Sequence, residues 1–345
     1  MTTPDQSRSE VNTLSSFKKA SSKRSSVVAL DESTETIAAL ENDMLEVQIE
    51  IADDDDEKQR LSKRTVPFEK VPVWMQDNAF ITDAYRPPLF SYRACVRSLF
   101  YQHNESVNIW SHLLGVILFL VIGILSWFVF LAPLRPVLGA GDIAVFYVFI
   151  LGAMVCLAMS SSFHCFLSHS EKICMDWVRA DYLGIVTLTL GSYYPTIYYG
   201  FYCHETMMIA YTATITVIGA ATIAVTLLKT FRTPHYRWLR AGCFLALGFF
   251  GIIPIVHAGV IYKLPLSFQA MSLGYLIGMG ASYVVGVLIY GFRIPECFWP
   301  GKFNIWFASH QLFHFCVVIA AVIHYVGVIN MMQYWNTDNH YTCNA

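Results

Sequence analysis

Apolar residues are gathered into long blocks along most of this chain, and polar residues are confined to the stretches between them. Seven mainly apolar windows follow one another, at about 107–131, 142–167, 177–200, 205–228, 237–259, 267–291 and 306–329. A helix of about 20 apolar residues spans a bilayer. Breakers separate several of the windows: Pro133, Pro136, Pro234, Pro265, Pro295, Pro300 and Gly301. The pattern predicts an all-α fold, a seven-transmembrane helix bundle over 107–330 followed by a tail at 331–345.

The first 85 residues have a different composition. They hold 17 of the 25 acidic residues and 10 of the 23 basic ones, with many serines and threonines. Such a segment buries too little apolar surface to offset its ordering entropy, so we predict a disordered arm at 1–85. Between the arm and the first window, at 86–106, Tyr92 to His103 has an amphipathic pattern. It is either a short helix on the membrane surface or a plain basic flank.

Overall composition agrees with a membrane protein, because 55% of the residues are hydrophobic and only 14% are charged. A nucleic-acid partner is not expected. The nine cysteines show no pairing motif. Cys203 and Cys343 can form a bridge only if both face an oxidising compartment.

Basic residues are distributed unequally between the two ends of the predicted bundle. The end that follows the arm carries Arg86, Arg93, Arg97, Lys172, Arg179, Lys229, Arg232, Arg237, Arg240, Arg293 and Lys302, whereas the other end carries only Arg135 and Lys263. By the positive-inside rule the N-terminus is cytosolic. Seven spans then place the C-terminus on the extracellular or lumenal side.

Four ionisable residues fall at matching depth near the cytosolic ends of three windows: His164, Asp181, His310 and His314. Ionisable side chains are costly in hydrocarbon unless they are paired or liganded, so such residues are functional candidates. His310 and His314 are one helical turn apart on one face, as a two-point metal grip requires. With His164 they make the three-imidazole ligand set of a catalytic zinc.

Neighbouring polar residues leave alternatives open. Asp181 is a general base, an acceptor for an imidazole, or a structural partner of a nearby polar group. Ser160 lies one turn before His164 and either serves the site or bonds its own helix backbone. His169 competes with His164, and His112 is a possible supporting residue. His257 and His324 are placed toward the opposite end.

Several stretches taken together are distinctive: HNESVNIWSHLLG (103–115), SSSFHCFLSHSEK (160–172), DYLGI (181–185), PGKFNIWFASHQLFH (300–314) and HYVGV (324–328). On these stretches the chain, over about 86–335, resembles the progestin and adipoQ receptor family, most of all its adiponectin receptor branch. The resemblance implies seven helices, a cytosolic N-terminus, and zinc held by His164, His310 and His314. It also implies that Asp181 contacts the metal's water, and it matches Ser160 to the family's serine.

The leading hypothesis is a zinc-dependent lipid amide hydrolase with receptor behaviour, for which the resemblance implies ceramide as the substrate and sphingosine and fatty acid as products. Asp181 would act as general base and Ser160 as an oxyanion donor. An extracellular protein or small ligand would shift the bundle between activity states, at the plasma membrane. The alternative is a non-catalytic receptor or scaffold with structural zinc, whose arm recruits cytosolic partners. That alternative includes a Golgi-resident, kinase-trapping role, since a Golgi member of the family shares part of the pattern.

Overall fold

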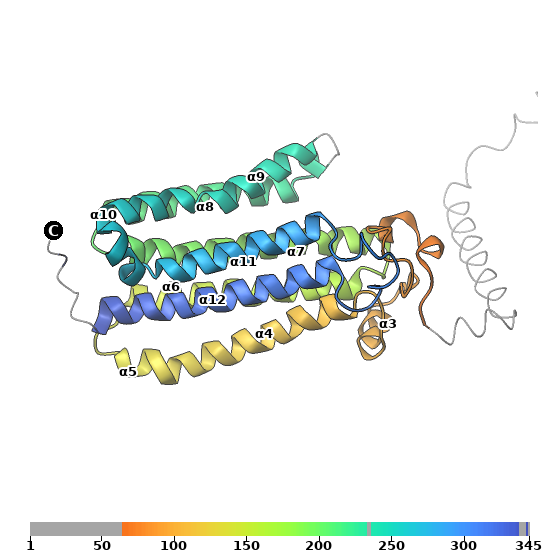
Figure 1. Ribbon diagram of the computed structural model, residues 1–345, viewed down its shortest axis with the longest axis horizontal. Helices are drawn as coiled ribbons and strands as arrows, with labels where there is room; N and C mark the ends of the chain where they lie inside the picture. Colours follow the sequence, from red (N-terminus) through yellow and green to blue (C-terminus); the bar gives the residue numbers. More distant parts are fainter. Residues whose placement is uncertain (1–63, 233–235, 338–342, 344–345) are drawn as a thin grey trace, which may run out of the picture. The chain divides into compact units, whose positions relative to one another are not determined.

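The computed structural model describes residues 64–345, except 233–235, 338–342 and 344–345 (Figure 1). Within these residues there is no β-strand, only an isolated bridge between Val66 and Tyr85, so the predicted all-α class is confirmed. The helices are α3 (Tyr92–Arg97), α4 (Ser106–Ser126), α5 (Ala132–Leu134), α6 (Ala140–Phe166), α7 (Glu171–Gly200), α8 (Glu205–Leu227), α9 (Arg237–Phe249), α10 (Ile252–Ala270), α11 (Leu273–Gly291) and α12 (Ser309–Thr337). A π-helical stretch, Trp127–Leu131, joins α4 to α5.

Among the described residues, six helical segments are long and apolar enough to cross a membrane: Ser106–Leu134, Ala140–Phe166, Glu205–Leu227, Gly242–Ala270, Leu273–Gly291 and Ser309–Thr337. Helix α7 also has the length, since its 30 residues extend about 45 Å. It is not among the six, and its sequence is rich in tyrosine, threonine and glycine. Helix α7 packs against α6, α8, α10 and α12. With α7 included, the helices correspond to the seven predicted windows.

Two predicted boundaries were wrong in the second half of the bundle. Pro265 does not end a span but lies inside α10, where Lys263 has a φ of 61° and kinks the helix. The chain then stays helical to Ala270, and the real turn is at Met271–Ser272. Helix α12 also runs to Thr337, beyond the predicted start of the tail.

The predicted arm boundary at residue 85 was also wrong, because the segment just before it is folded. Its backbone pairs at Val66 and Tyr85, with N···O distances of 2.7 and 3.0 Å. Val71, Met75, Ile81 and Tyr85 form a small core together with Ala308, which directly precedes α12. The prediction rested on the average composition of the first 85 residues, in which these few apolar side chains carry little weight. Residues 1–63 of the predicted arm lie outside the described residues.

Helices α6 and α7 approach closely because glycines line their contact. A Cβ atom on Gly184 would lie 2.9 Å from Cα of Cys156, and one on Gly152 would lie 2.8 Å from the carbonyl oxygen of Thr187. Small residues allow such contacts between helices in membranes. The close approach fixes the middle of α6 beside the middle of α7.

Figure 1 shows α3, the start of α4 and the start of α12 at one end of the bundle, and the end of the described chain at the other. At that other end, after α7, Cys203 forms a disulfide with Cys343. The sequence allowed a Cys203–Cys343 bridge only if both cysteines face an oxidising compartment. That bridge is present in the structure.

Candidate metal centre

The three predicted histidine ligands come together at one end of the bundle. His164 lies in the last turn of α6, and His310 and His314 lie in the first turns of α12. One ring nitrogen from each lies within 4.8 Å of the other two. The Nε2 atoms of His164 and His310 are 3.3 Å apart. Segments separated by more than 140 residues in the sequence thus converge into a group that can hold a metal ion.

Glu105, which directly precedes α4, and Asn108 in its first turn fix the tautomers of two of these rings. The Nδ1 atom of His164 lies 2.7 Å from a carboxylate oxygen of Glu105, and that of His314 lies 3.1 Å from the carbonyl oxygen of Asn108. A carboxylate and a carbonyl only accept hydrogen bonds, so both Nδ1 atoms carry the proton and donate. Each Nε2 atom is then left with its lone pair, as a metal ligand requires.

This arrangement fits a tetrahedral metal site. With Zn–N bonds of about 2.0–2.1 Å, two ligand nitrogens of a tetrahedron are about 3.3–3.4 Å apart. The distance between the Nε2 atoms of His164 and His310 is in that range. At this distance either the His310 Nε2–H donates to His164, or a shared cation takes the lone pairs of both nitrogens. The donor set of three imidazoles suits zinc among the common metals.

Asp181 and Ser160 lie beside the histidines rather than among them. Asp181 is on α7, three turns from its start rather than the one turn that the predicted window gave. Its carboxylate interacts with the Ser160 hydroxyl and, electrostatically, with His164. Ser160 is buried on α6, one turn before His164. Asp181 and Ser160 thus lie next to the histidine group as an interacting pair.

His112 supports the site by stacking. Its ring lies parallel to that of His314, with centroids 3.7 Å apart and planes at 6°. It is 3% exposed, and neither of its nitrogens has a hydrogen-bond partner. His112 therefore fixes the plane of a candidate ligand without belonging to the ligand group.

Three other histidines of the described residues, His169, His257 and His324, lie outside the group. His169 lies in the turn after α6, with Nδ1 3.2 Å from the Ser170 hydroxyl. His257 lies 2.9 Å from the Tyr211 hydroxyl. His324 is in the middle of α12, not toward its outer end, and its ring packs edge-on to Phe149.

Sequence reasoning missed three residues that surround the histidines: Glu105, Asn108 and Arg86. Glu105 and Asn108 belong to the stretch at 103–115, but the sequence analysis gave neither of them a role. Arg86 was counted among the flanking charges, yet its side chain is buried. A second carboxylate, Asp142, was also missed. It is buried at the opposite end and accepts hydrogen bonds from Tyr199, Asn336 and the Gly139 amide.

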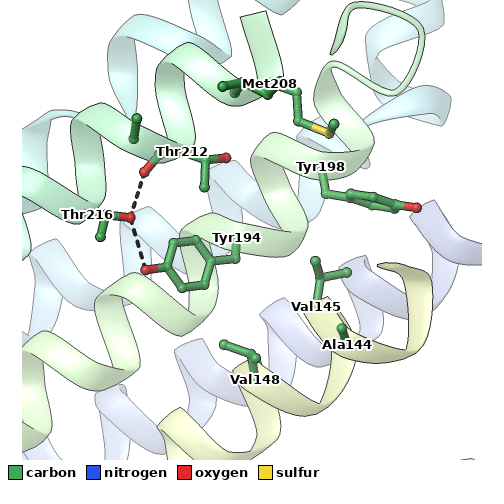
Figure 2. A pocket seen from close by; sticks show the side chains of 10 residues that line it. Ala144, Val145, Val148, Tyr194, Tyr198, Met208, Thr212 and Thr216 are labelled. Atoms are coloured by element: carbon green, nitrogen blue, oxygen red, sulfur yellow. Dashed lines mark hydrogen bonds between the residues drawn. The ribbon is translucent and has the colours of Figure 1, made fainter. Parts of the chain in front are cut away.

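A groove of about 490 Å³ lies between α6, α7 and α8 (Figure 2). Figure 2 shows the Tyr194 hydroxyl within the groove, 3.1 Å from the Thr216 hydroxyl. A second groove, of about 380 Å³, lies between α4 and α6. No residue of the histidine group lines either groove.

Comparison with known proteins gives a consistent set of relatives. The haemolysin-III related family model matches residues 100–325. The chain is 41% identical over 267 residues to the adiponectin receptor protein of Drosophila melanogaster, which covers 77% of this chain and 59% of that protein. It is 37% identical over 295 residues to progestin and adipoQ receptor-like protein 1 of Caenorhabditis elegans (83% and 67%). It is 37% identical over 276 residues to the ADIPOR-like receptor IZH2 of Saccharomyces cerevisiae (79% and 86%). The chain thus spans less than two thirds of the length of the fly relative.

Proposed function

This chain belongs to the haemolysin-III related family, in the adiponectin receptor-like group of progestin and adipoQ receptors, and on that premise we propose that it is a zinc-dependent lipid amide hydrolase that also acts as a receptor. It is a multi-pass membrane protein. The observation that carries the proposal is the convergence of His164, His310 and His314, with Asp181 and Ser160 beside them.

The three Nε2 lone pairs would hold the ion and leave one position open for the reaction. A zinc ion there would supply a Lewis acid, which polarises an amide carbonyl and lowers the pKa of water to about 7. Glu105 and Asn108 keep two imidazoles in the required tautomer. A carboxylate or carbonyl in that position also raises the basicity of the ligand.

Asp181 is the proton carrier in this proposal. Its carboxylate accepts a proton from the attacking water as the C–O bond forms, and returns it to the nitrogen as the C–N bond breaks. The products are a fatty acid and an amine. The Ser160 hydroxyl, which interacts with Asp181, holds the carboxylate in place. Once Asp181 has taken the proton from water, this hydroxyl would be free to donate to the developing oxyanion.

The substrate class follows from the position of the site. His164, His310 and His314 lie within the first or last turns of membrane-spanning helices, so a scissile bond that reaches them belongs to a molecule in the bilayer. We propose ceramide, cleaved to sphingosine and fatty acid, as that lipid amide.

The test is metal analysis of detergent-purified protein beside a ceramide turnover assay. We expect about one zinc per chain, lost together with turnover in His314→Ala. His257→Ala, a histidine within a span but outside the group, is the matched control and should keep both. Zinc loss with full turnover in His314→Ala would show that the metal is not the catalyst.

A non-catalytic receptor or scaffold is the second candidate, and one observation favours it: the histidine group joins α6 to α12, as a structural metal would. Asp181→Asn separates the two candidates. It keeps the three imidazoles but removes the base, so hydrolysis should fall by about 100-fold or more while zinc is retained. Signalling that survives in this variant would favour the scaffold.

Orientation and partners complete the proposal. We propose that the metal centre faces the cytosol and that the Cys203–Cys343 end faces the oxidising side, since disulfides persist there and basic residues gather at the opposite end. The plasma membrane is the proposed location, with the Golgi membrane as the alternative. An extracellular ligand would bind at the disulfide end, and cytosolic partners would bind the N-terminal arm.

A further inference from the structure

The residues before α4 lie against the metal centre as well as leading into the first span. Arg86 is the clearest case, since its side chain is only 1% exposed. A buried guanidinium is costly unless it is hydrogen-bonded, so its partners show what holds it in place.

The hydrogen-bond partners of Arg86 are two main-chain carbonyls at the end of α6 and the Ser98 hydroxyl, which directly follows α3. One terminal nitrogen, Nη1, donates to the Ser98 hydroxyl at 2.7 Å and to the carbonyl oxygen of Cys165 at 2.9 Å. The other, Nη2, donates to the carbonyl oxygen of His164 at 2.6 Å. The last four carbonyl groups of a helix lack partners within it and form its negative end, and Arg86 satisfies two of them.

His164 is therefore held from two sides. Arg86 bonds its main-chain carbonyl, and Glu105 bonds its side-chain Nδ1. Arg86 and Glu105, which also attract each other electrostatically, both precede α4. We infer that Arg86 is a positioning residue of the metal centre, which makes the segment before α4 a part of that centre.

This inference rests on the proposed metal site and has a consequence for the segment itself. The backbone N–H groups of Leu89 and Phe90 donate to the carbonyls of Ser168 and His169, at 2.7 and 3.1 Å, so the segment follows the turn after α6. If the segment fixes a ligand, metal binding must in turn stabilise the docking of the segment, because coupling between two sites is reciprocal.

The first experiment compares Arg86→Gln with Arg93→Gln, which changes an exposed arginine in α3. The full-length protein is loaded with zinc, and release to a chelator is timed. Arg86→Gln should release zinc about 10-fold faster or more, the usual effect of losing a residue that orients a ligand. Arg93→Gln should match the wild type. Arg86→Lys keeps the charge but not the planar fork, so its release should also be faster than wild type.

Thermal unfolding separates positioning from general stabilisation. A purely structural Arg86 would lower the melting temperature equally with and without zinc. If Arg86 positions the metal centre, its replacement reduces the rise in melting temperature that zinc provides. Wild-type zinc release and an undiminished zinc gain in folded Arg86→Gln or Arg86→Lys would overturn the inference.

A measurement on the wild type keeps the inference testable even if neither Arg86 variant folds. Cys95 of α3 is fully buried beside this contact. Removing zinc should speed its alkylation several-fold, read by mass spectrometry, while Cys156 in the middle of α6 stays protected. Unchanged Cys95 reactivity on zinc removal would overturn the inference alone. A wild-type protein that binds no zinc would overturn the proposed function as well.

Discussion

The Glu105 carboxylate and the His164 imidazole meet at 2.7 Å, although one precedes α4 and the other ends α6. The same carboxylate oxygen also accepts a hydrogen bond from the Asn108 side chain, at 2.7 Å. Burial raises the pKa of Glu105, whereas the hydrogen bonds from His164 and Asn108 and, when His164 is protonated, its positive charge lower it below the ordinary value. Glu105 is thus an anion at any physiological pH and a constant acceptor for His164.

Glu105→Gln should therefore weaken zinc binding by about 10- to 100-fold without unfolding the bundle, because a neutral amide no longer raises the basicity of His164. Competition with a zinc chelator measures the change. Glu205→Gln, at the exposed start of α8, serves as the control and should bind zinc like the wild type. Equal affinity in the two variants would remove Glu105 from the site.

The stacking of His112 on His314 gives a second prediction. Since neither nitrogen of His112 has a partner, His112→Phe should keep the stack, retain zinc, and leave the thermal midpoint equal or higher. His112→Ala removes the ring and should lower both zinc affinity and stability, by about 2–4 kcal/mol for the latter. Zinc loss in His112→Phe would mean that an imidazole nitrogen is needed there.

Stability should depend on pH through His103, which is fully buried before α4. Burial and the neighbouring Arg86 charge lower its pKa to about 3. Below a pH of about 6.5 the unfolded chain binds a proton that the folded chain does not, so stability falls as the pH decreases from about 6.5 toward 3. One such group contributes a slope of up to about 1.4 kcal/mol per pH unit.

Thermal midpoints of the wild type and His103→Gln, taken between pH 7 and 4, test this dependence. The variant should show a shallower decline. Parallel curves for wild type and His103→Gln would contradict the prediction.

A fourth prediction concerns the glycine contact between α6 and α7. In Gly184→Ala the added methyl would lie 2.9 Å from the main chain of Cys156, one turn from Ser160, so the helices must separate. We expect a loss of about 1–3 kcal/mol and reduced turnover, because Asp181 moves relative to His164. Gly280→Ala in α11 meets nothing within 4 Å and should be neutral or slightly stabilising. Equal unfolding temperatures in both variants would be inconsistent with a tight α6–α7 contact.

The proposed sidedness can be read from cysteine labelling in sealed microsomes that expose their cytosolic face. Cys343→Ser frees Cys203 at the disulfide end. An impermeant maleimide should modify Cys297, in the loop before α12, at once, and Cys203 only after detergent is added. The reverse order would place the metal centre on the lumenal side.

The histidine group was predictable because its members share a depth. Each lies in the first or last turns of an apolar window, and helical geometry converts sequence position into depth. Glu105 and Asn108 were not predictable in the same way, since one precedes the window and the other acts through its main-chain carbonyl. Charge counting treats every arginine near a span as solvated, so it could not identify Arg86 as buried. Pro265 gave a wrong span boundary for a similar reason. A proline usually signals the end of a helix, but here the kink at Lys263 lets the helix continue.

The composition of α7 has a practical consequence for anyone who works with a relative of this protein. This helix packs against α6, α8, α10 and α12 but is rich in tyrosine, threonine and glycine, so a count based on hydropathy alone finds an even number of crossings. An even count would assign both termini to one compartment. Under the proposed seven-span topology, epitope tags, protease-protection assays and antibodies against the final residues that are planned on an even count would be aimed at the wrong side of the bilayer.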